Sequence, residues 1–307
     1  MKAFIEQRAD PFIFQNDGRY YFTASVPAFD RVILRSADTL EGLRDAAEKT
    51  VWTRHSSGIM SCNIWAPELH YVDGQWVIYF AAARGGADEA GRFDHRTYAL
   101  VNPNPDPMDG EFTEAGRIDT GWESFTIDST TVEYGGKRYF IWAQRDYAIP
   151  GNSNLYIAEM ESAMKLRLPA VLLSVPEYDW ECQGFLVNEG PSCLIHDGNL
   201  FVTYSASATD ERYAMGLLTL RKGERPLNAK AWKKSPVPVM ATEARNGLYG
   251  PGHNSFTVDE EGRDLLVFHA RPYPGFHGTA LSDPNRHCYL RAVRYAQDGT
   301  PLFQEEA

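Results

Sequence analysis

The hydrophobic pattern of the chain repeats five times. Each copy begins with a glycine, continues as a run of aromatic and β-branched residues, and ends in small residues. The runs are GRYYFTA from Gly18, GQWVIYFAA from Gly74, GKRYFIWAQ from Gly136, GNLFVTYSA from Gly198 and GRDLLVFHA from Gly262, so successive copies begin 56 to 64 residues apart. A fixed period of this length is typical of architectures in which each copy is one supersecondary unit.

A second short strand and a polar turn precede each of these glycines. The segments are PFIFQND, PELHYVD, STTVEYG, PSCLIHD and SFTVDEE. Two strands joined by a turn that contains Asp or Gly indicate a β-hairpin. Further strands are predicted between the hairpins, at RVILRS, RTYALV, LYIAEM, AMGLLTL and YLRAVRY. Helix-like patterns occur only near LEGLRDAAEKT and ESAMKLR, and both are short.

Five units of about 60 residues, each with four strands, fit the blades of a propeller. We therefore predict an all-β fold, a five-bladed β-propeller with four-stranded antiparallel blades around a central axis. The repeat spans the chain, so residues 1–307 are predicted to form a single domain, with the Pro- and Asn-rich segment 101–112 as a loop between strands. The alternative is a sandwich of unrelated hairpins, which does not explain the even spacing.

Composition and charge narrow the classes of partner. Aromatic residues make up 13% of the chain, which favours strands and the binding of sugar rings. The net charge of −11 disfavours nucleic acid, and no apolar stretch is long enough to span a bilayer. The N-terminal sequence MKAFIEQRAD lacks the apolar region of a signal peptide, and the four cysteines form no CxxC pair. We therefore expect a cytoplasmic protein with free thiols.

Polar residues occupy matched positions in the repeat. Asp10, Asp128, Glu189 and His253 each lie eight or nine residues before the glycine of their own copy. The second copy has Ala66 at the corresponding place, with Trp65 beside it. The first strand of every propeller blade lines the central axis, so these five positions are expected to converge at one end of the channel.

Clustered carboxylates repel one another and raise at least one pKa, which marks a candidate functional site. Two chemistries use such a cluster: binding of a hard cation such as Ca²⁺, and glycoside hydrolysis by a carboxylic acid and an opposing carboxylate. Aromatic side chains nearby suit the apolar face of a sugar. The alternative is structural: Asp10 and Asp128 cap strand starts, and His253 is a buried histidine with satisfied hydrogen bonds.

These segments resemble glycoside hydrolase family 43, the five-bladed propellers that include arabinofuranosidases, arabinanases and β-xylosidases. The matching segments are RADPFIF, NIWAPELHYVDGQWVIYFAA, TIDSTTVEYGGKRYFIWA, GFLVNEGPSCLIHDGNLFVTYSA, GPGHNSF, DPNRH and DGTPLF. The resemblance implies an inverting mechanism, with the two reacting carboxyl groups roughly 6.5–9.5 Å apart. Asp10 is then the general base, Glu189 the general acid, and Asp128 the residue that orients Glu189 and raises its pKa.

The resemblance also implies the residues that surround the sugar. The expected substrate-binding residues are Trp65, Phe125, Ile127, Glu181, His253, Arg271 and Arg286. Members of the family often hold Ca²⁺ or another small ion on the axis, so His253 is also the expected metal-site residue, and no organic cofactor is expected. Glu181 lies in DWECQGF, which is similar to the acid motif of the fructan-cleaving propellers, but the other motifs of that family are missing.

The forms WAPE, VNEGP and DPNRH are similar to those of exo-acting α-L-arabinofuranosidases that trim 1,5-linked arabino-oligosaccharides. Exo action requires loops that block one end of the cleft, and segments 83–111 and 271–287 are the candidates. Three alternatives stay open: a β-xylosidase or bifunctional xylosidase and arabinofuranosidase, an endo-arabinanase, and a sugar-binding propeller without catalysis. The expected partner is an arabino-oligosaccharide, with no nucleic acid and no membrane.

Overall fold

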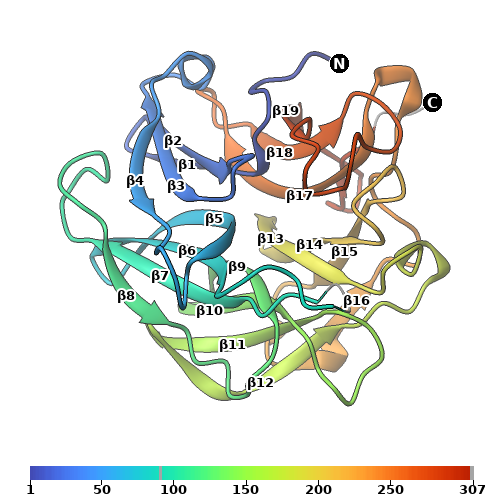
Figure 1. The fold of residues 1–307 in the computed structure, drawn as a ribbon. Coiled ribbons are helices and arrows are strands. Elements are labelled where there is room, and N and C mark those ends of the chain that lie inside the picture. The colour runs from blue at the N-terminus through green and yellow to red at the C-terminus, as the bar shows by residue number, and fades with distance from the viewer. Residues whose placement is uncertain (90–91, 305–307) are drawn as a thin grey trace.

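Five antiparallel sheets surround a central axis in a computed structural model that describes residues 1–89 and 92–304 (Figure 1). Blade 1 contains β1 (Ala9–Asn16), β2 (Arg19–Ser25), β3 (Arg31–Ala37) and β4 (Lys49–Thr53), and blade 2 contains β5 (Cys62–Val72), β6 (Gln75–Ala83), β7 (Arg96–Asn102) and β8 (Thr113–Arg117). Blade 3 contains β9 (Thr126–Tyr134), β10 (Lys137–Gln144), β11 (Asn154–Ser162) and β12 (Lys165–Ser174).

Blade 4 contains β13 (Asn188–His196), β14 (Asn199–Ala206), β15 (Ala214–Leu220) and β16 (Trp232–Lys234). Blade 5 contains β17 (Tyr249–Val258), β18 (Asp264–Arg271) and β19 (His287–Ala292), and a small ribbon of β20 (Arg294–Tyr295) and β21 (Pro301–Leu302) follows it. The predicted five-bladed propeller is therefore confirmed.

The helical content of the described residues is limited to four short 3₁₀ turns. These are η1 (Glu41–Arg44), η2 (Asp179–Glu181), η3 (Ala229–Ala231) and η4 (Ala244–Asn246). The helix-like pattern of LEGLRDAAEKT contains η1, but ESAMKLR covers the end of β11, the turn at residues 163–164 and the start of β12. No helix among the described residues is long and apolar enough to cross a membrane.

The N-terminal segment completes blade 5. Ile5 forms an antiparallel bridge with Cys288 on β19, the outermost strand of that sheet. The Phe4 N–H donates to the Cys288 carbonyl at 2.8 Å, and the Cys288 N–H donates to the Ile5 carbonyl at 2.8 Å. The first residues of the chain therefore take the place of a fourth strand and close the ring.

Hydrophobic clusters hold neighbouring blades together. Blades 3 and 4 share a cluster that includes Ile141, Val202 and Leu218. Each of the remaining pairs of neighbouring blades shares a similar cluster. Burial of these apolar surfaces stabilises the ring. The first strands, β1, β5, β9, β13 and β17, contact one another around the axis, as the repeat predicts.

Candidate active site

Each innermost strand carries an irregularity near the same end of the axis. The pairing register shifts between Ala9 and Phe12 in β1, and β5, β9, β13 and β17 have similar shifts. In the first three blades and the last, a residue with positive φ lies at this place: Asp10 (52°), Ala66 (46°), Asp128 (52°) and His253 (41°). Non-glycine residues rarely adopt this left-handed conformation, and such strain is concentrated at functional sites.

In blade 4 the corresponding left-handed residue is Gly190, with φ of 53°, so Glu189 lies one position earlier than the repeat predicts. A Cβ on Gly190 would lie 3.1 Å from the His253 ring, which leaves little room for any other residue. The Gly190 N–H donates to Asp128 Oδ2 at 2.9 Å. Glu189 is thus offset from the other two carboxylates, and its neighbour fixes Asp128.

Asp10 lies among cationic groups and donors. The Ser25 hydroxyl donates to Asp10 Oδ2 at 2.5 Å, while His253 Nδ1 and Arg286 Nη1 lie 3.3 and 3.5 Å from Oδ1. Burial acts to raise the pKa of Asp10, but the charges of His253 and Arg286 outweigh it and hold the pKa well below its usual range. Asp10 is therefore ionised at neutral pH.

Glu189 and Asp128 behave in the opposite way. Burial and the charge of Asp128 raise the pKa of Glu189 above the usual range of a carboxyl group, and burial together with the charge of Asp10 raises the pKa of Asp128. The Tyr213 hydroxyl donates to Glu189 Oε1 at 2.9 Å. Glu189 can therefore keep a proton at a pH where Asp10 has lost its own.

His253 stands between the carboxylates. Its backbone N–H donates to Ser205 Oγ at 2.7 Å, and its Nδ1 lies 3.8 Å from Asp128 Oδ2. Burial acts to lower the pKa of His253, but the charges of Asp10 and Asp128 raise it overall. Ca²⁺ requires several oxygen ligands, and no group of three or more His, Cys, Asp or Glu side chains in the described part of the chain is arranged to hold a metal ion. The ion expected near His253 therefore stays a prediction, and no step below uses one.

A pocket of about 580 Å³ opens above these groups. Trp65, Phe125 and Ile127 line it, together with Asp10, Asp128, Glu189, His253 and Arg286. The Trp65 ring is half-buried and stacks on His95, with 3.8 Å between ring centroids. The structure thus places eight of the ten predicted site residues around one cavity.

Glu181 lies outside the pocket, and its predicted contact with the sugar is corrected. The side chain is completely buried, and Lys234 Nζ lies 2.8 Å from its Oε1. Tyr204 and Asn188 also donate to the carboxylate, at 2.8 and 3.0 Å. Because Asn188 directly precedes Glu189, Glu181 supports the strand that carries Glu189 and does not line the pocket.

Arg271 is also corrected. Only 3% of its side chain is exposed, and it donates to the backbone carbonyls of Thr209 and Ala280 at 2.7 and 2.8 Å. Its guanidinium is held by these carbonyls, and Arg271 is not among the residues that line the pocket. Arg286, 15 residues later, takes that place beside Asp10.

Sequence reasoning missed several residues of the site. Ser25 joins two blades, because its hydroxyl donates to Asp10 and accepts the Ala66 N–H at 2.8 Å. Tyr213 and Thr209 come from the loop after β14, and Thr279, Ala280 and Leu281 come from the loop after β18. Loop residues fall outside the matched strand positions, so the repeat carried no signal for them. Ser25 ends β2, and a periodic comparison of that strand could have found it.

Comparison with known proteins agrees with this geometry. The model of the family "Glycosyl hydrolases family 43" matches residues 3–301. An extracellular exo-α-(1→5)-L-arabinofuranosidase of Streptomyces avermitilis is 47% identical over 300 residues, which are 97% of this chain and 62% of that protein. A protein of the same name from Streptomyces chartreusis is 48% identical over 271 residues, 88% of this chain and 81% of that protein.

A crystal structure of an α-L-arabinofuranosidase from Lactobacillus brevis superposes with a TM-score of 0.96 at 50% identity, over 99% of this chain and 96% of that one. The chain spans about three fifths of the Streptomyces avermitilis protein. Two relatives are named extracellular, so the prediction of a cytoplasmic protein is wrong. The four cysteines are free, as predicted, but free thiols did not identify the compartment. The matched carboxylates, the five-bladed ring and these comparisons together show that the chain belongs to glycosyl hydrolases family 43.

Proposed function

We propose that the chain is an inverting, exo-acting α-L-arabinofuranosidase that releases terminal arabinose from 1,5-linked arabino-oligosaccharides. The observation that carries the proposal is the convergence of Asp10, Asp128 and Glu189 on one pocket, with His253 and Arg286 beside Asp10 alone. In this arrangement the pKa of Asp10 is lowered and that of Glu189 is raised. Two carboxyl groups whose environments separate their pKa values provide a base and an acid at the same pH. The names of the relatives supply the sugar and the linkage.

In this mechanism Asp10 accepts a proton from a water molecule as the water oxygen attacks the anomeric carbon. Glu189 gives its proton to the glycosidic oxygen as the bond between that oxygen and the anomeric carbon breaks. Asp128 keeps Glu189 protonated by the proximity of its charge. Arg286 and His253 keep Asp10 ionised before the reaction. One displacement inverts the anomeric configuration, and we predict a separation of roughly 6.5–9.5 Å between the two carboxyl groups.

Two loops support exo action. Ala87 and Phe93 come from the β6–β7 loop, and Thr279, Ala280 and Leu281 come from the β18–β19 loop, and all five line the pocket. These loops lie within the two segments that the sequence analysis selected as candidates to block the cleft. We infer that these loops block one end of the cleft, so that the pocket takes the end of a chain.

Product analysis tests the function. The protein is incubated with linear α-1,5-arabinopentaose, and the early products are separated by chromatography. We expect arabinose and arabinotetraose first. Arabinobiose and arabinotriose would instead indicate an endo-arabinanase. Faster release from an aryl β-xyloside than from an aryl α-L-arabinofuranoside would indicate a β-xylosidase, and binding without turnover of either sugar would indicate a non-catalytic propeller.

Substitution of the acid and the base tests the mechanism. Glu189→Gln and Asp10→Asn are each expected to lower kcat by about 10²–10⁴-fold, because each removes one proton-transfer group. Glu133→Gln is the matched control: Glu133 lies on β9 with Asp128, is 67% exposed and pairs with Arg138 away from the pocket. Rates near that of the wild type for both pocket variants would refute the assignment.

A further inference from the structure

The loop between β18 and β19 forms one side of the pocket without a hydrophobic anchor. Thr279, Ala280 and Leu281 from this loop line the cavity. The structure describes all of residues 272–282, and none of them is buried. The segment also contains no strand or helix. Apolar packing therefore does not determine its shape, and polar contacts must hold it.

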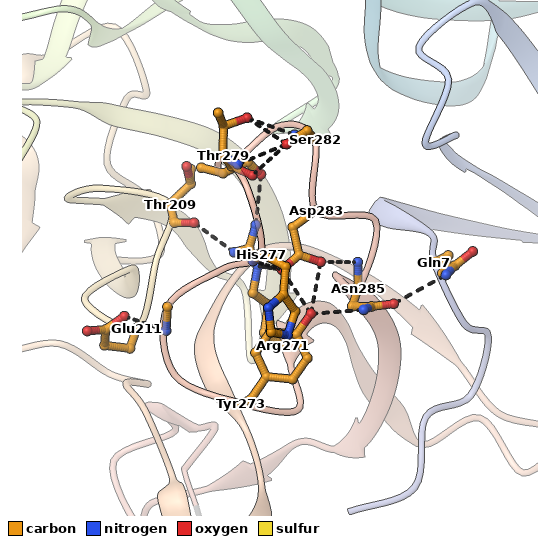
Figure 2. A network of polar contacts seen from close by, with 12 residues as sticks. Gln7, Thr209, Glu211, Arg271, Tyr273, His277, Thr279, Ser282, Asp283 and Asn285 are labelled. Carbon is orange, nitrogen blue, oxygen red and sulfur yellow. Dashed lines mark hydrogen bonds and ion pairs between the residues drawn. The ribbon is translucent and has the colours of Figure 1, made fainter.

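Asp283 holds the loop from within (Figure 2). Its side chain is completely buried, although most of the loop around it is exposed. The carboxylate accepts hydrogen bonds from the Tyr273 hydroxyl at 2.8 and 2.9 Å, from the His277 N–H at 2.7 Å and from the Asn285 N–H at 2.9 Å. One buried charge thus draws together both ends of the loop.

Arg271 ties the same loop to the neighbouring blade (Figure 2). Its Nη2 donates to the Ala280 carbonyl at 2.8 Å, and its Nη1 donates to the Thr209 carbonyl at 2.7 Å. Thr209 belongs to blade 4 and also lines the pocket. The guanidinium therefore joins two pocket-lining segments. Its Nε lies 3.8 Å from Asp283 Oδ2, so the two buried charges balance each other.

Two further hydrogen bonds hold the edges of the loop. The Gly275 N–H donates to Glu211 Oε2 at 2.8 Å, and Gln7 Nε2 donates to Asn285 Oδ1 at 3.2 Å. Asn285 Nδ2 in turn donates to the Tyr273 hydroxyl at 2.8 Å. The network thus extends from blade 4 across the loop to the N-terminal segment.

We propose that Arg271 and Asp283 are positioning residues, which hold Thr279–Leu281 as a preformed wall of the pocket without contact to the sugar. The inference rests on the proposed function, since the wall is taken to contact the terminal sugar. A buried ion pair adds little stability compared with apolar residues of the same volume. Both carbonyls that accept hydrogen bonds from the Arg271 guanidinium belong to residues that line the pocket. A role in stability alone would not require this placement.

A preformed wall affects binding more than chemistry. A loop that must become ordered when the sugar binds adds an entropic cost to association. Asp10, Asp128 and Glu189 lie on strands, and Arg286 directly precedes β19, so the reacting groups stay in place when the wall loosens. Loss of the network should therefore raise KM and leave kcat close to that of the wild type.

The experiment compares steady-state kinetics of Asp283→Asn and Tyr273→Phe with those of the wild type on α-1,5-arabinotriose. We expect Asp283→Asn to raise KM by about ten-fold and to change kcat by less than about three-fold. Tyr273→Phe removes only one hydroxyl and keeps the pair of charges, so its KM should lie between those of the wild type and Asp283→Asn. It also keeps the test informative if Asp283→Asn does not fold.

Asp259→Asn is the matched control. Asp259 lies in the turn between β17 and β18 of the same blade and accepts backbone N–H groups of Glu261 and Arg263, but it does not line the pocket. Its KM should equal that of the wild type. An unchanged KM in both loop variants, an equal rise in Asp259→Asn, or a loss confined to kcat would overturn the proposal. If the wild type releases xylose, the proposed function fails, and the same comparison on a xylo-oligosaccharide still tests the wall.

Discussion

The buried ion pair between Glu181 and Lys234, which contacts the start of β13, leads to a prediction about stability. Glu181 is completely buried, and 10% of the Lys234 side chain is exposed. Besides Lys234, four donors reach the carboxylate: the Glu177 and Tyr178 N–H groups at 2.9 Å, the Asn188 amide at 3.0 Å and the Tyr204 hydroxyl at 2.8 Å. Both carboxylate oxygens accept, so the NH₂ of a glutamine would face a donor whichever way the amide was turned.

Glu181→Gln leaves the Lys234 charge without its buried partner. Removal of one partner from a buried pair costs about 3–5 kcal/mol. The unfolding entropy of about 2.1 cal/mol/K per residue gives about 0.6 kcal/mol/K for the 307 residues. The expected fall in Tm is therefore about 5–8 °C. Burial acts to raise the pKa of Glu181, but Lys234 and the backbone donors lower it overall, so this stability is present above the usual pKa of a glutamate and is lost as pH falls below it.

Differential scanning calorimetry at neutral pH measures the shift. Glu177→Gln is the matched control, because Glu177 is 53% exposed and lies 3.4 Å from the same Lys234. Its Tm should change by less than about 1 °C. The double variant Glu181→Gln with Lys234→Met should recover part of the loss, because it removes both charges. A Tm of Glu181→Gln within 1 °C of the wild type would show that the pair is not coupled to stability as argued.

Three further outcomes follow from the site. In Asp128→Asn the neighbouring charge that raises the pKa of Glu189 is lost, so the alkaline limb of the kcat/KM profile should move to lower pH; an unmoved limb would contradict the electrostatic role of Asp128. Gly190→Ala places a Cβ on a residue with a left-handed φ of 53°, only 3.1 Å from the His253 ring. We expect the free energy of unfolding to fall by about 1–2 kcal/mol, seen as a lower Tm in thermal melting, and kcat to fall as well. Wild-type values of Tm and kcat would argue against the close approach. Trp65→Ala removes an aromatic wall of the pocket, so KM for arabinotriose should rise about five- to ten-fold in initial-rate assays, whereas an unchanged KM would place the sugar elsewhere.

The repeat allowed most of the fold and the centre of the site to be predicted. Matched positions in a propeller converge whatever their separation in sequence, which is why Asp10, Asp128 and His253 could be placed on the axis. The repeat matched Glu189 to these residues, but the positive φ shows that its neighbour Gly190 is the equivalent residue in blade 4. The sequence alone could not show this, because the distance to the marker glycine depends on the turn.

The corrected residues show where sequence reasoning ended. A buried carboxylate and a carboxylate that faces substrate are the same residue type, and Lys234, which neutralises Glu181, lies 53 positions later. Arg271 ends a strand beside the pocket, but its guanidinium turns toward two backbone carbonyls. The orientation of such a side chain depends on the partners that the loops place beside it, and the loop sequences do not follow the repeat.

The closure of blade 5 by Phe4 and Ile5 has a consequence for the order of folding. The bridge between Ile5 and Cys288 joins residues from opposite ends of the chain, and contacts of such separation carry a large loop-closure entropy. Asp10 follows directly after this seam, and its partners His253 and Arg286 belong to the last blade. We therefore expect the hairpins of the four preceding blades to form before Asp10 meets its counter-charges, so that in refolding the recovery of activity should lag behind the recovery of β-sheet structure.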